Sequence, residues 1–568
     1  MESSIGYKAV QTLFQFTCHL LFRELKITGA HHIPTTEPCI FIVAPHSNQF
    51  IDPCLFMGMC PRPTYAIMAA SACRLSLVGQ FGKILNAIPV VRPQDVMSLG
   101  SGQIRYNQKE NQIEGKGTQF LSEVHVRDSI VVQNKSYHVV QVTSNTILQV
   151  LHVNEEQEDI FADYQIMPYI NQSNIYEGVH NHLNQHHAIA LFPEGASHDQ
   201  TEILPLRAGF AVMALGAAAK NAKLDVKLVP VGLNYSHPER FRSKVVISYG
   251  QPFSLDPIEV EQYRLGDRKH AVNRLLERSD QALKRVIVNA PNHQTLTIIR
   301  AARRLYLSKR NSFEQAVETD RCFVQLWAKV KQKNPARLDA IEKQIELYQD
   351  SLHFLGIKDD QVDKLNTTPV KAVIQLTVCV IQLILLAGLC TPAFILNLPL
   401  IWILKTISKR KQKELLASSR FRITGKDVVS TWRVIPAVFI APIVYSVHAL
   451  CYLSVLYNYR NHWSLKVKLI QTGYAWLIQP VLSYLLIRFS DKGIYLYRFV
   501  RPLYLAISNP RVGNLIQTKR QKLSEEITKF VHEYSPELEF LSTDSKHQQR
   551  LKTTKKKVDL RVFCKSLL

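Results

Sequence analysis

The sequence has no pair of cysteines at the C-x-x-C spacing and no grouping of cysteine and histidine at the spacing of a zinc site. Its ten cysteines are scattered over 568 residues, which excludes a small disulfide-framed secreted protein. The first residues lack the basic and apolar layout of a signal peptide. The adjacent pair His186 and His187 has no third ligand at metal spacing. We therefore expect no metal and no redox cofactor.

Acidic residues are scarce relative to basic ones. The chain has 46 Asp and Glu against 69 Lys and Arg, which gives a formal net charge of +23. This surplus favours an anionic partner such as nucleic acid, an acidic membrane surface or a phosphorylated substrate. No nucleic-acid recognition motif is present, and the basic residues flank apolar runs. We therefore expect membrane lipids and phosphorylated small molecules as partners, and no nucleic acid.

Short apolar runs alternate with helical patterns between residues 39 and 300. The strand-like runs are 39–45, 86–93, 188–195 and 227–235, and the helical ones include 53–60 and 208–221. Strands that alternate with helices predict an α/β domain. Within it, residues 103–165 hold short β-rich segments separated by turn residues, which predicts a small β insertion. We expect an α/β domain over 39–300 with this insertion, followed by helices and a C-terminal multi-span membrane region.

The segments on either side of this domain have a different composition. Residues 8–25 are apolar and aromatic, so we expect segment 1–38 to hold a helix that lies on a membrane or on the domain, with a core helix as the alternative. Charged, periodic residues predict helices with solvated faces over 301–370. The last predicted segment, 491–568, is a basic C-terminal region.

Long apolar runs dominate residues 371–490. Residues 372–404 carry no formal charge, and as a helix they would be about 50 Å long, against about 30 Å for a bilayer core. Pro392 and Pro399 interrupt the run, so we expect a helical hairpin or a re-entrant pair. Two further candidate spans are residues 434–457 and 467–487. Buried core helices of a soluble protein are the alternative, which three such runs within about 120 residues disfavour.

A basic stretch lies between the first two apolar runs. Residues 405–433 hold nine Lys and Arg residues, which marks the cytoplasmic side of a membrane. We read this stretch as a loop. Two hairpins that enter the membrane from this side would leave every soluble segment, the α/β domain included, in the cytosol.

A histidine and an aspartate follow the first predicted strand. His46 and Asp52 are six residues apart, and a loop-to-helix turn can bring them together. A carboxylate on one imidazole nitrogen fixes the tautomer and raises the basicity of the other nitrogen. The pair therefore predicts a general base suited to taking a proton from an alcohol. A chain with 20 histidines contains several such pairs by chance, so the pair alone is weak support.

Three more blocks end or occupy predicted strands: I-P-V-V-R at 88–92, F-P-E-G at 192–195 and V-P-V at 229–231. With the His-Asp block, in this order, they resemble the motifs of the glycerolipid acyltransferase family (PlsC-like). The spellings P-H-S-N-Q-F-I-D-P and F-P-E-G-A-S-H-D are most similar to the eukaryotic microbial subgroup that acylates glycerol 3-phosphate and dihydroxyacetone phosphate at the endoplasmic reticulum. The resemblance covers residues 35–300 and extends loosely to R-A-A-R-R at 300–304. The wider family places four residues between His and Asp, whereas here there are five.

The resemblance implies that His46 is the general base and that Asp52 orients it. The acyl donor is already a thioester, so no acyl-enzyme is required. Ser197 lies in G-A-S-H-D and not in a G-x-S-x-G nucleophile elbow, so we do not expect covalent serine catalysis. His198 is an extra base in one interpretation and a structural polar residue in the other.

The resemblance also implies a set of substrate-binding residues. Arg92 is expected to hold the phosphate of the acceptor. Arg207, at the start of the Ala-rich helix, is expected to be either a second phosphate contact or an ordinary surface ion pair. Glu194, Gly195 and Ser197 are expected to line the acceptor pocket, where Gly195 permits close approach of the backbone.

The expected function is transfer of a fatty acyl group from acyl-CoA to the sn-1 hydroxyl of glycerol 3-phosphate, in the membrane of the endoplasmic reticulum. Acyl-CoA is then a substrate, and no cofactor is needed. Three alternatives stay open: a dihydroxyacetone-phosphate acyltransferase, a lysophosphatidate sn-2 acyltransferase, and an inactive membrane scaffold with the same fold. The presence of His46, Asp52, Arg92 and Glu194 argues against the scaffold.

Overall fold

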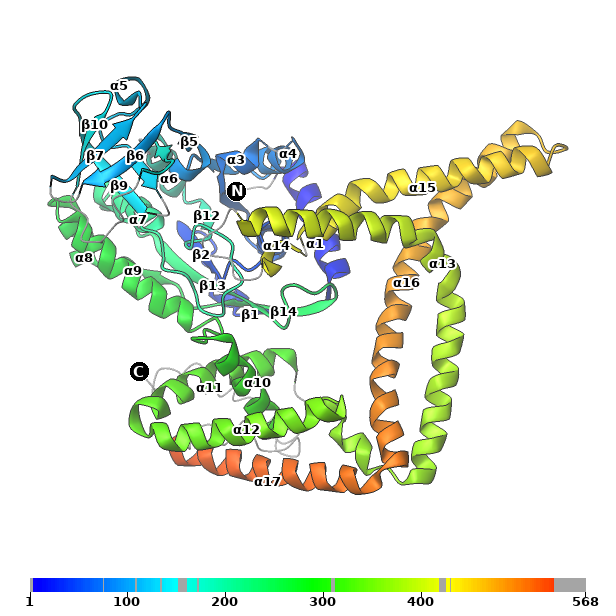
Figure 1. Cartoon of the computed structure of the whole chain (residues 1–568). Helices are drawn as coiled ribbons and strands as arrows, with labels where there is room; N and C mark the ends of the chain where they lie inside the picture. Colours follow the sequence, from blue (N-terminus) through cyan, green and yellow to red (C-terminus); the bar gives the residue numbers. More distant parts are fainter. Residues whose placement is uncertain are drawn as a thin grey trace.

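The computed structural model describes residues 4–74, 76–107, 110–132, 135–151, 161–170, 173–307, 312–417, 425–429 and 431–535. Most of the predicted region 491–568 beyond residue 535 therefore lies outside the described residues. The described chain forms an α/β domain, a β insertion, a helical unit and a set of long apolar helices (Figure 1).

An eight-stranded sheet forms the centre of the α/β domain. Its strands are β1 (Phe22–Thr28), β2 (Cys39–Ala44), β3 (Thr64–Ala69), β4 (Ile88–Val90), β12 (Ala188–Leu191), β13 (Lys227–Tyr235), β14 (Ser243–Tyr249) and β15 (Phe253–Ser254). The order is β1-β14-β13-β2-β12-β3-β4, with β15 paired to β13. The run from β13 through β2, β12 and β3 to β4 is parallel throughout. The carboxyl ends of these five strands therefore share one edge of the sheet.

Helices cover both faces of this sheet. They are α1 (Ile5–Leu21), α2 (Ile51–Met59), α3 (Ala70–Cys73), α4 (Ser76–Ile84), α6 (Ser173–Asn184), α7 (Gly209–Lys220), α8 (Pro257–Arg264) and α9 (Arg268–Lys284), with short 3-10 turns η1 (Ala30–His32) and η2 (Pro93–Asp95). Alternate residues of β2 belong to two separate cores. Ile40 and Ile42 pack with α6, α7 and α9, while Phe41 and Val43 pack with α1 and α2. The central strand is buried on both faces, as its uninterrupted apolar sequence predicts.

The N-terminal segment is part of the α/β domain. Helix α1 buries a stripe at helical spacing, which includes Val10, Phe14 and Cys18, against the sheet and α2. These buried residues of α1 therefore lie on the α/β domain. Strand β1 pairs in parallel with β14, so the predicted boundary after residue 38 falls inside the domain.

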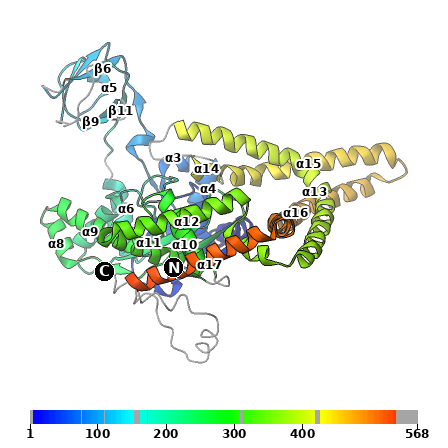
Figure 2. The ribbon, with the colours of Figure 1, turned by 60° about the horizontal axis from the view of Figure 1, so that its bottom comes forward.

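The β insertion forms a second sheet. Its strands are β5 (Ser98–Leu99), β6 (Gln103–Asn107), β7 (Gln112–Lys116), β8 (Ser129–Val132), β9 (Lys135–Val142), β10 (Ile147–Val150) and β11 (Gln165–Met167), with helix α5 (Phe120–Glu123). Their pairings are antiparallel, and the described strands of this sheet pair with none of the main sheet. A bridge between Ile104 and Ala162 joins β6 to the segment before β11, so the sheet closes on itself around its own core. The predicted insertion is confirmed, and Figure 2 shows it standing away from the main body.

A helical unit follows the α/β domain. It contains α10 (His293–Tyr306), α11 (Phe313–Lys333), α12 (Pro335–Leu355), the 3-10 segment η3 (Asp359–Asn366) and the C-terminal α17 (Pro510–Tyr534). These elements share one apolar core, although α17 is more than 140 residues further along the chain. The helices predicted over 301–370 are present, and the segment predicted as a basic C-terminal region supplies one more.

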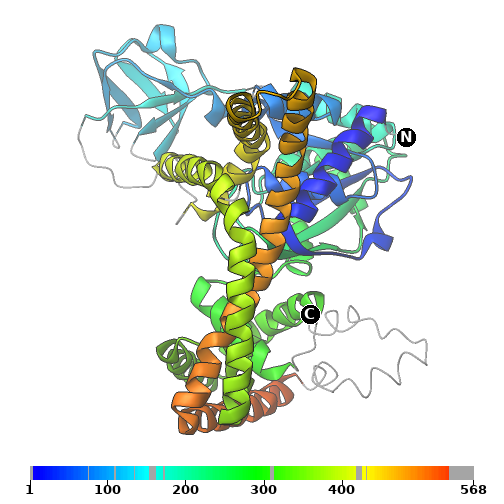
Figure 3. The same cartoon turned by 90° about the vertical axis from the view of Figure 1, so that its right-hand side faces the viewer.

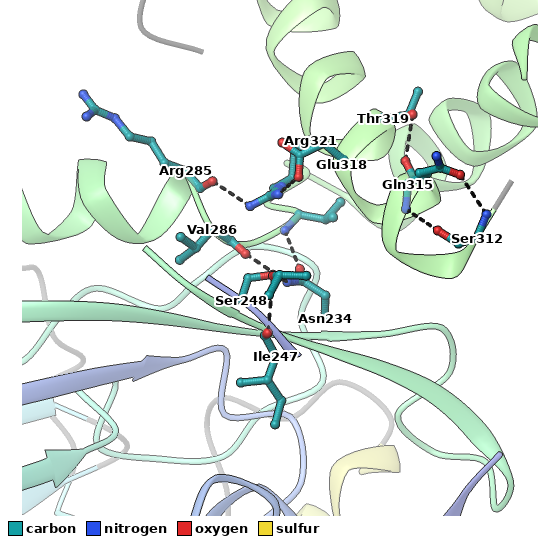
Figure 4. A network of polar contacts seen from close by, with 12 residues as sticks. Asn234, Ile247, Ser248, Arg285, Val286, Ser312, Gln315, Glu318, Thr319 and Arg321 are labelled. Carbon is teal, nitrogen blue, oxygen red and sulfur yellow. Dashed lines mark hydrogen bonds and ion pairs between the residues drawn. The ribbon is translucent and has the colours of Figure 1, made fainter. Parts of the chain in front are cut away.

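Polar contacts join the helical unit to the α/β domain (Figure 4). Arg321 of α11 donates to the carbonyl of Arg285 at the end of α9, 2.8 Å away. The buried amide of Asn234 in β13 donates to the carbonyl of Val286 and accepts from the N–H of Val288. The chain after α9 is therefore fixed to both parts.

The long apolar helices are α13 (Pro369–Ala417), α15 (Thr431–Tyr459) and α16 (Leu465–Ser508), with the short α14 (Lys426–Val429) between the first two. Figures 1 and 3 show α13 and the second half of α16 side by side, while α15 and the first half of α16 form a hairpin that projects from the molecule. The hairpin predicted within 372–404 is wrong, because these residues lie in one 49-residue helix that bends. Pro392 and Pro399 lie inside it, and proline kinks a helix without ending it when the following turns still pair.

The stretch 405–433, predicted from the sequence as a loop, is helical over most of its described residues. Residues 405–417 continue α13 to its end, and residues 426–429 form α14. Lys and Arg have good helix propensity, so the basic residues of this stretch are compatible with a helix.

Two described helices, α13 and α15, are long and apolar enough to cross a membrane. In their most apolar stretches only 6% and 17% of the residues are buried, so they are not the core helices of a soluble domain. Large apolar side chains are exposed along both, among them Ile384, Leu385 and Trp402 in α13. The run 467–487, which was predicted as a further span, lies in α16 and does not reach the same criterion within the described chain. The two long apolar helices indicate an association with a membrane.

Candidate active site

The predicted site residues gather at the carboxyl edge of the main sheet. His46 follows β2, Glu194 and Gly195 follow β12, and Arg92 follows β4. In a sheet with parallel strands and helices on both faces, this edge is where ligands bind. The structure therefore brings together residues that lie up to 150 positions apart in the sequence.

His46 and Asp52 form a pair despite the extra residue between them. The imidazole Nδ1 of His46 lies 3.0 Å from Asp52 Oδ2. Asp52 is in the first turn of α2, and its carboxylate also accepts the backbone N–H of Asn48 at 2.8 Å. That contact folds the loop back over the start of the helix, so the five intervening residues are accommodated. Because an ionised carboxylate only accepts, His46 carries its proton on Nδ1 and a lone pair on Nε2.

Tyr235 completes the surroundings of Asp52. Its hydroxyl donates to Asp52 Oδ1 at 2.5 Å, and both side chains are buried. Burial, with the adjacent charge of Asp52, raises the pKa of Tyr235 well above its usual value. The hydroxyl therefore stays protonated and remains a donor. Tyr235 is the last residue of β13, which lies beside β2 in parallel, and this pairing carries the side chain to Asp52.

The ring of His46 is held on one face by Phe192. The two rings stack with centroids 4.2 Å apart and 23° between their planes. The backbone on either side is fixed as well, because the carbonyl of His46 accepts the N–H of His198 at 3.0 Å. Nε2 has no hydrogen-bond partner among the described residues, and the side chain is 13% exposed. The geometry presents one basic nitrogen with fixed orientation.

Glu194 connects the loops of the site from inside. Its carboxylate accepts the N–H of His46 at 2.8 Å and of Leu204 at 3.0 Å, and it bonds Nε2 of His198. The side chain is 0% exposed. The carboxylate is therefore enclosed by backbone and imidazole donors, and it holds the loops of the site together. His198 is also fully buried, with its Nε2 at the carboxylate of Glu194.

Two arginines flank Gly195. This glycine has φ of +73°, and a Cβ on it would lie 3.2 Å from Cγ of Arg207, so both the conformation and the space favour glycine. Arg92 Nη1 donates to the carbonyl of Gly195 at 3.0 Å. Arg207 is tied to the same turn by its N–H, which donates to the carbonyl of Pro193 at 2.7 Å.

Arg92 is oriented by a residue that sequence reasoning did not single out. Asp95, three positions later, accepts from Nε at 2.9 Å and from Nη2 at 2.7 Å. With the bond to Gly195, three of the five guanidinium N–H groups are used. The side chain is one-third exposed, so two N–H groups remain for an anion.

Within the described residues, the start of α15 contacts the active-site loop. The N–H of Phe50, within the loop between His46 and Asp52, donates to Oγ1 of Thr431 at 3.4 Å. Thr431 is the first residue of α15 and is fully buried, and Val434 packs on the same core as Leu55 of α2. The start of an apolar helix thus supports the active-site loop.

Among these residues, Tyr235 had a signal in the sequence, since it ends a predicted strand. Asp95 had a weak one, because an acid three residues from an arginine is a common ion pair. Thr431 had none, since 381 residues separate it from Phe50. Ser197, which the sequence placed in the pocket, is 5% exposed.

Comparison with known proteins gives two family matches. A model described as Acyltransferase matches residues 24–130, and one described as Glycerol-3-phosphate acyltransferase 2 C-terminal domain matches residues 298–539. The first spans the His-Asp loop and Arg92, and the second spans the helical unit and the apolar helices.

Relatives match over almost the whole chain. An uncharacterized acyltransferase of Schizosaccharomyces pombe is 32% identical over 95% of this chain and 82% of that protein. Glycerol-3-phosphate O-acyltransferases 1 and 2 of Saccharomyces cerevisiae are each 29% identical, over 94% and 92% of this chain and 72% and 76% of those proteins. A solved structure of the 1-acyl-sn-glycerophosphate acyltransferase PlsC from Thermotoga maritima aligns with 47% of this chain and 79% of that chain, at 11% identity and a TM-score of 0.24.

Replacing Glu194 by glutamine is expected to destabilise the protein. Glutamine offers one oxygen and an NH₂ group, so at least one of the backbone donors now facing the carboxylate would meet another donor. The loss is about 2 kcal/mol, which lowers the thermal midpoint by several degrees. Glu202→Gln, an exposed residue nearby, is the matched control and should melt like the wild type. An unchanged midpoint for Glu194→Gln would show that the carboxylate does not hold the loops.

Proposed function

The chain belongs to the glycerolipid acyltransferase family, and from that premise we propose that it transfers a fatty acyl group from acyl-CoA to the sn-1 hydroxyl of glycerol 3-phosphate. The observation that carries the proposal is the His46–Asp52 pair, which lies at the same sheet edge as two arginines around Gly195. The names of the yeast relatives and of the C-terminal family support glycerol 3-phosphate as the acceptor.

Nε2 of His46 acts as the general base. It takes the proton of the acceptor hydroxyl while the hydroxyl oxygen attacks the thioester carbonyl. The C–S bond then breaks, the electron pair leaves on the sulfur of coenzyme A, and the imidazolium returns the proton to that thiolate. The proposed transfer is direct and forms no acyl-enzyme. Acyl-CoA is a substrate, and the scheme uses no cofactor.

Asp52 and Tyr235 prepare the base. The carboxylate keeps Nδ1 protonated and stabilises the imidazolium that forms during transfer. Tyr235 donates to the other carboxylate oxygen, so the buried charge is held in one position. Phe192 prevents rotation of the ring by stacking on it.

Arg92 and Arg207 would hold the phosphate of the acceptor. Arg92 has two free N–H groups and a guanidinium plane fixed by Asp95, which suits bidentate contact with a phosphate. Arg207 lies against Gly195 from within the same turn and supplies a second positive charge. Gly195 keeps the space between them open, and Glu194 acts from behind as a positioning residue.

The proposed location is the membrane of the endoplasmic reticulum, with a multi-pass membrane part and the α/β domain in the cytosol. Coenzyme A esters and glycerol 3-phosphate are cytosolic metabolites, so the site must face that side. The exposed apolar helices α13 and α15 and the basic residues of 405–433 support this arrangement.

The first test measures the purified full-length chain with labelled palmitoyl-CoA and three acceptors: glycerol 3-phosphate, dihydroxyacetone phosphate and lysophosphatidate. We expect the highest kcat/KM with glycerol 3-phosphate. His46→Ala should lose about 10²–10⁴-fold in kcat, as expected for removal of a general base. Asp52→Asn should lose as much or less. His353→Ala, an exposed residue of α12, is the control. Near-normal turnover in a folded His46→Ala variant would contradict the mechanism.

Arg92→Ala is expected to raise the KM for glycerol 3-phosphate about 10–100-fold, because a phosphate dianion loses a charged hydrogen-bond partner. The KM for acyl-CoA should change little. Arg264→Ala, which removes an exposed arginine of α8, serves as the control for lost surface charge. Equal changes in both KM values would show that Arg92 does not discriminate the acceptor.

Tyr235→Phe is expected to lower kcat about tenfold with little change in either KM, because the aspartate loses a donor to its charged form. Tyr249→Phe is a matched control, since this tyrosine is also buried in the same core but does not contact Asp52. If both variants lose the same activity, the effect comes from core packing and Tyr235 is no positioning residue.

A further inference from the structure

One side chain of the α/β domain contacts both the end of α1 and a long apolar helix. Arg242 immediately precedes β14. Its Nη1 lies 3.2 Å from the carbonyl oxygens of His19, Leu20 and Phe22. Its own N–H donates to the carbonyl of Leu21 at 2.8 Å. The last carbonyls of a helix have no partner within it, and a cation there also meets the negative end of the helix dipole. Arg242 therefore closes the carboxyl end of α1.

The same side chain makes an ion pair with α16. Arg242 Nε donates to Oδ2 of Asp491 at 2.9 Å, and the two side chains are only 9% and 21% exposed. Asp491 follows shortly after the apolar run 467–487. Arg242 has a φ of +60°, a conformation that a non-glycine residue adopts at a cost. The contacts with α1 and α16 offset that cost, so the backbone is held where the guanidinium reaches both helices.

Hydrogen bonds among α13, α15 and α16 make these helices one unit. Ser483 of α16 donates to the amide oxygen of Asn397 in α13 at 3.0 Å, and the hydroxyl of Tyr445 in α15 lies 2.8 Å from the Ser483 oxygen. Nδ1 of His448 in α15 lies 2.9 Å from the amide oxygen of Gln479 in α16. Polar side chains that meet between apolar helices hold them together, because lipid offers them no other partner. Fixing α16 at its ion pair therefore also fixes α15.

Helix α15 carries an exposed apolar surface that begins at the active-site loop. Its first residue, Thr431, contacts the loop at Phe50. Large exposed apolar side chains follow at helical spacing, namely Val438, Phe439, Ile443 and Val447. At about 1.5 Å per residue they lie about 10 to 24 Å from Thr431 along the helix. A long acyl chain that leaves the base in this direction meets apolar side chains along its length, provided that α15 is held at the loop.

We propose that Arg242 and Asp491 are a positioning pair that gives the reaction its preference for long acyl chains. The inference rests on the proposed transfer from acyl-CoA. The exposed surface of α15 begins at the loop that holds the base, so the acyl chain of the donor is its occupant. Without the ion pair, α15 is no longer held at the loop, and a long chain loses these contacts to water. A short acyl chain does not extend beyond the loop and is therefore insensitive to the pair.

The test compares palmitoyl-CoA with butyryl-CoA as donors to glycerol 3-phosphate, with the full-length chain in phosphatidylcholine nanodiscs. Asp491→Ala should lower kcat/KM about tenfold for palmitoyl-CoA and less than about twofold for butyryl-CoA, because only the long chain depends on the position of α15. Asp491→Glu, which keeps the charge, should restore most of the palmitoyl value. Lys492→Ala removes the exposed charge beside Asp491 and is the control, which should keep both values.

Two further variants separate the pair from general packing. Asp491→Asn keeps the shape of the side chain and weakens the pair, so it should show the same selective loss to a smaller extent even where Asp491→Ala does not fold. Arg242→Ala also removes the contacts at the end of α1, so it should melt lower than the wild type. Adding Asp491→Ala to Arg242→Ala should lower kcat/KM for palmitoyl-CoA no further, because the pair is already broken.

The outcomes distinguish this inference from the proposed function. Equal losses with both donors in the Asp491 variants, no loss with either, or a further loss in the double variant would overturn the positioning pair. The proposed function would stand in each of these cases, since the wild type still transfers both acyl groups to glycerol 3-phosphate. A wild-type chain that transfers neither acyl group to glycerol 3-phosphate would overturn both.

Discussion

The buried carboxylate of Asp52 is the group on which the site depends. An ionised carboxylate without exposed surface is costly, and three donors offset that cost: Nδ1 of His46, the N–H of Asn48 and the hydroxyl of Tyr235. They come from the end of β2, the loop before α2 and the end of β13. The carboxylate therefore receives all three hydrogen bonds only when β2 and β13 are adjacent and parallel. The pairing of these strands thus also fixes the orientation of His46.

The sequence predicted those parts of the fold whose signal lies within a short stretch of residues. The buried strands, the β insertion and the His46–Asp52 pair all lie within short stretches whose pattern carries the signal. The hairpin predicted within 372–404 is wrong, because the turns that flank Pro392 and Pro399 continue the helix. The contacts of Tyr235 with Asp52 and of Thr431 with Phe50 span 183 and 381 residues, and no periodicity in one sequence reports such distances.

Glu194 shows what a motif can and cannot say about a residue. Its box predicts a carboxylate at the edge of the sheet, and the structure has one there. The direction of the side chain depends on which donors lie behind it, and these come from His46, His198 and Leu204. Arg92 differs from Glu194 in that its polar groups are only partly used. Asp95 and Gly195 fix the guanidinium and still leave two N–H groups without a bond to them. Burial, which the motif does not encode, separates the enclosed Glu194 from the partly exposed Arg92.

The contact between Thr431 and Phe50 gives a physical reason for a catalytic domain and apolar helices in one chain. Under the proposed reaction the acyl chain arrives on a soluble carrier and leaves on a lipid, and each methylene exposed to water on the way would cost about 0.8 kcal/mol. A site far from the bilayer would incur that cost over the whole chain length. Here α15, whose apolar residues are largely exposed, begins at the loop that holds the base. The ion pair of Arg242 with Asp491 ties α16 to the same domain at 2.9 Å, so the apolar helices are held at two points. The reacting ester would then form beside the surface that receives its acyl chain.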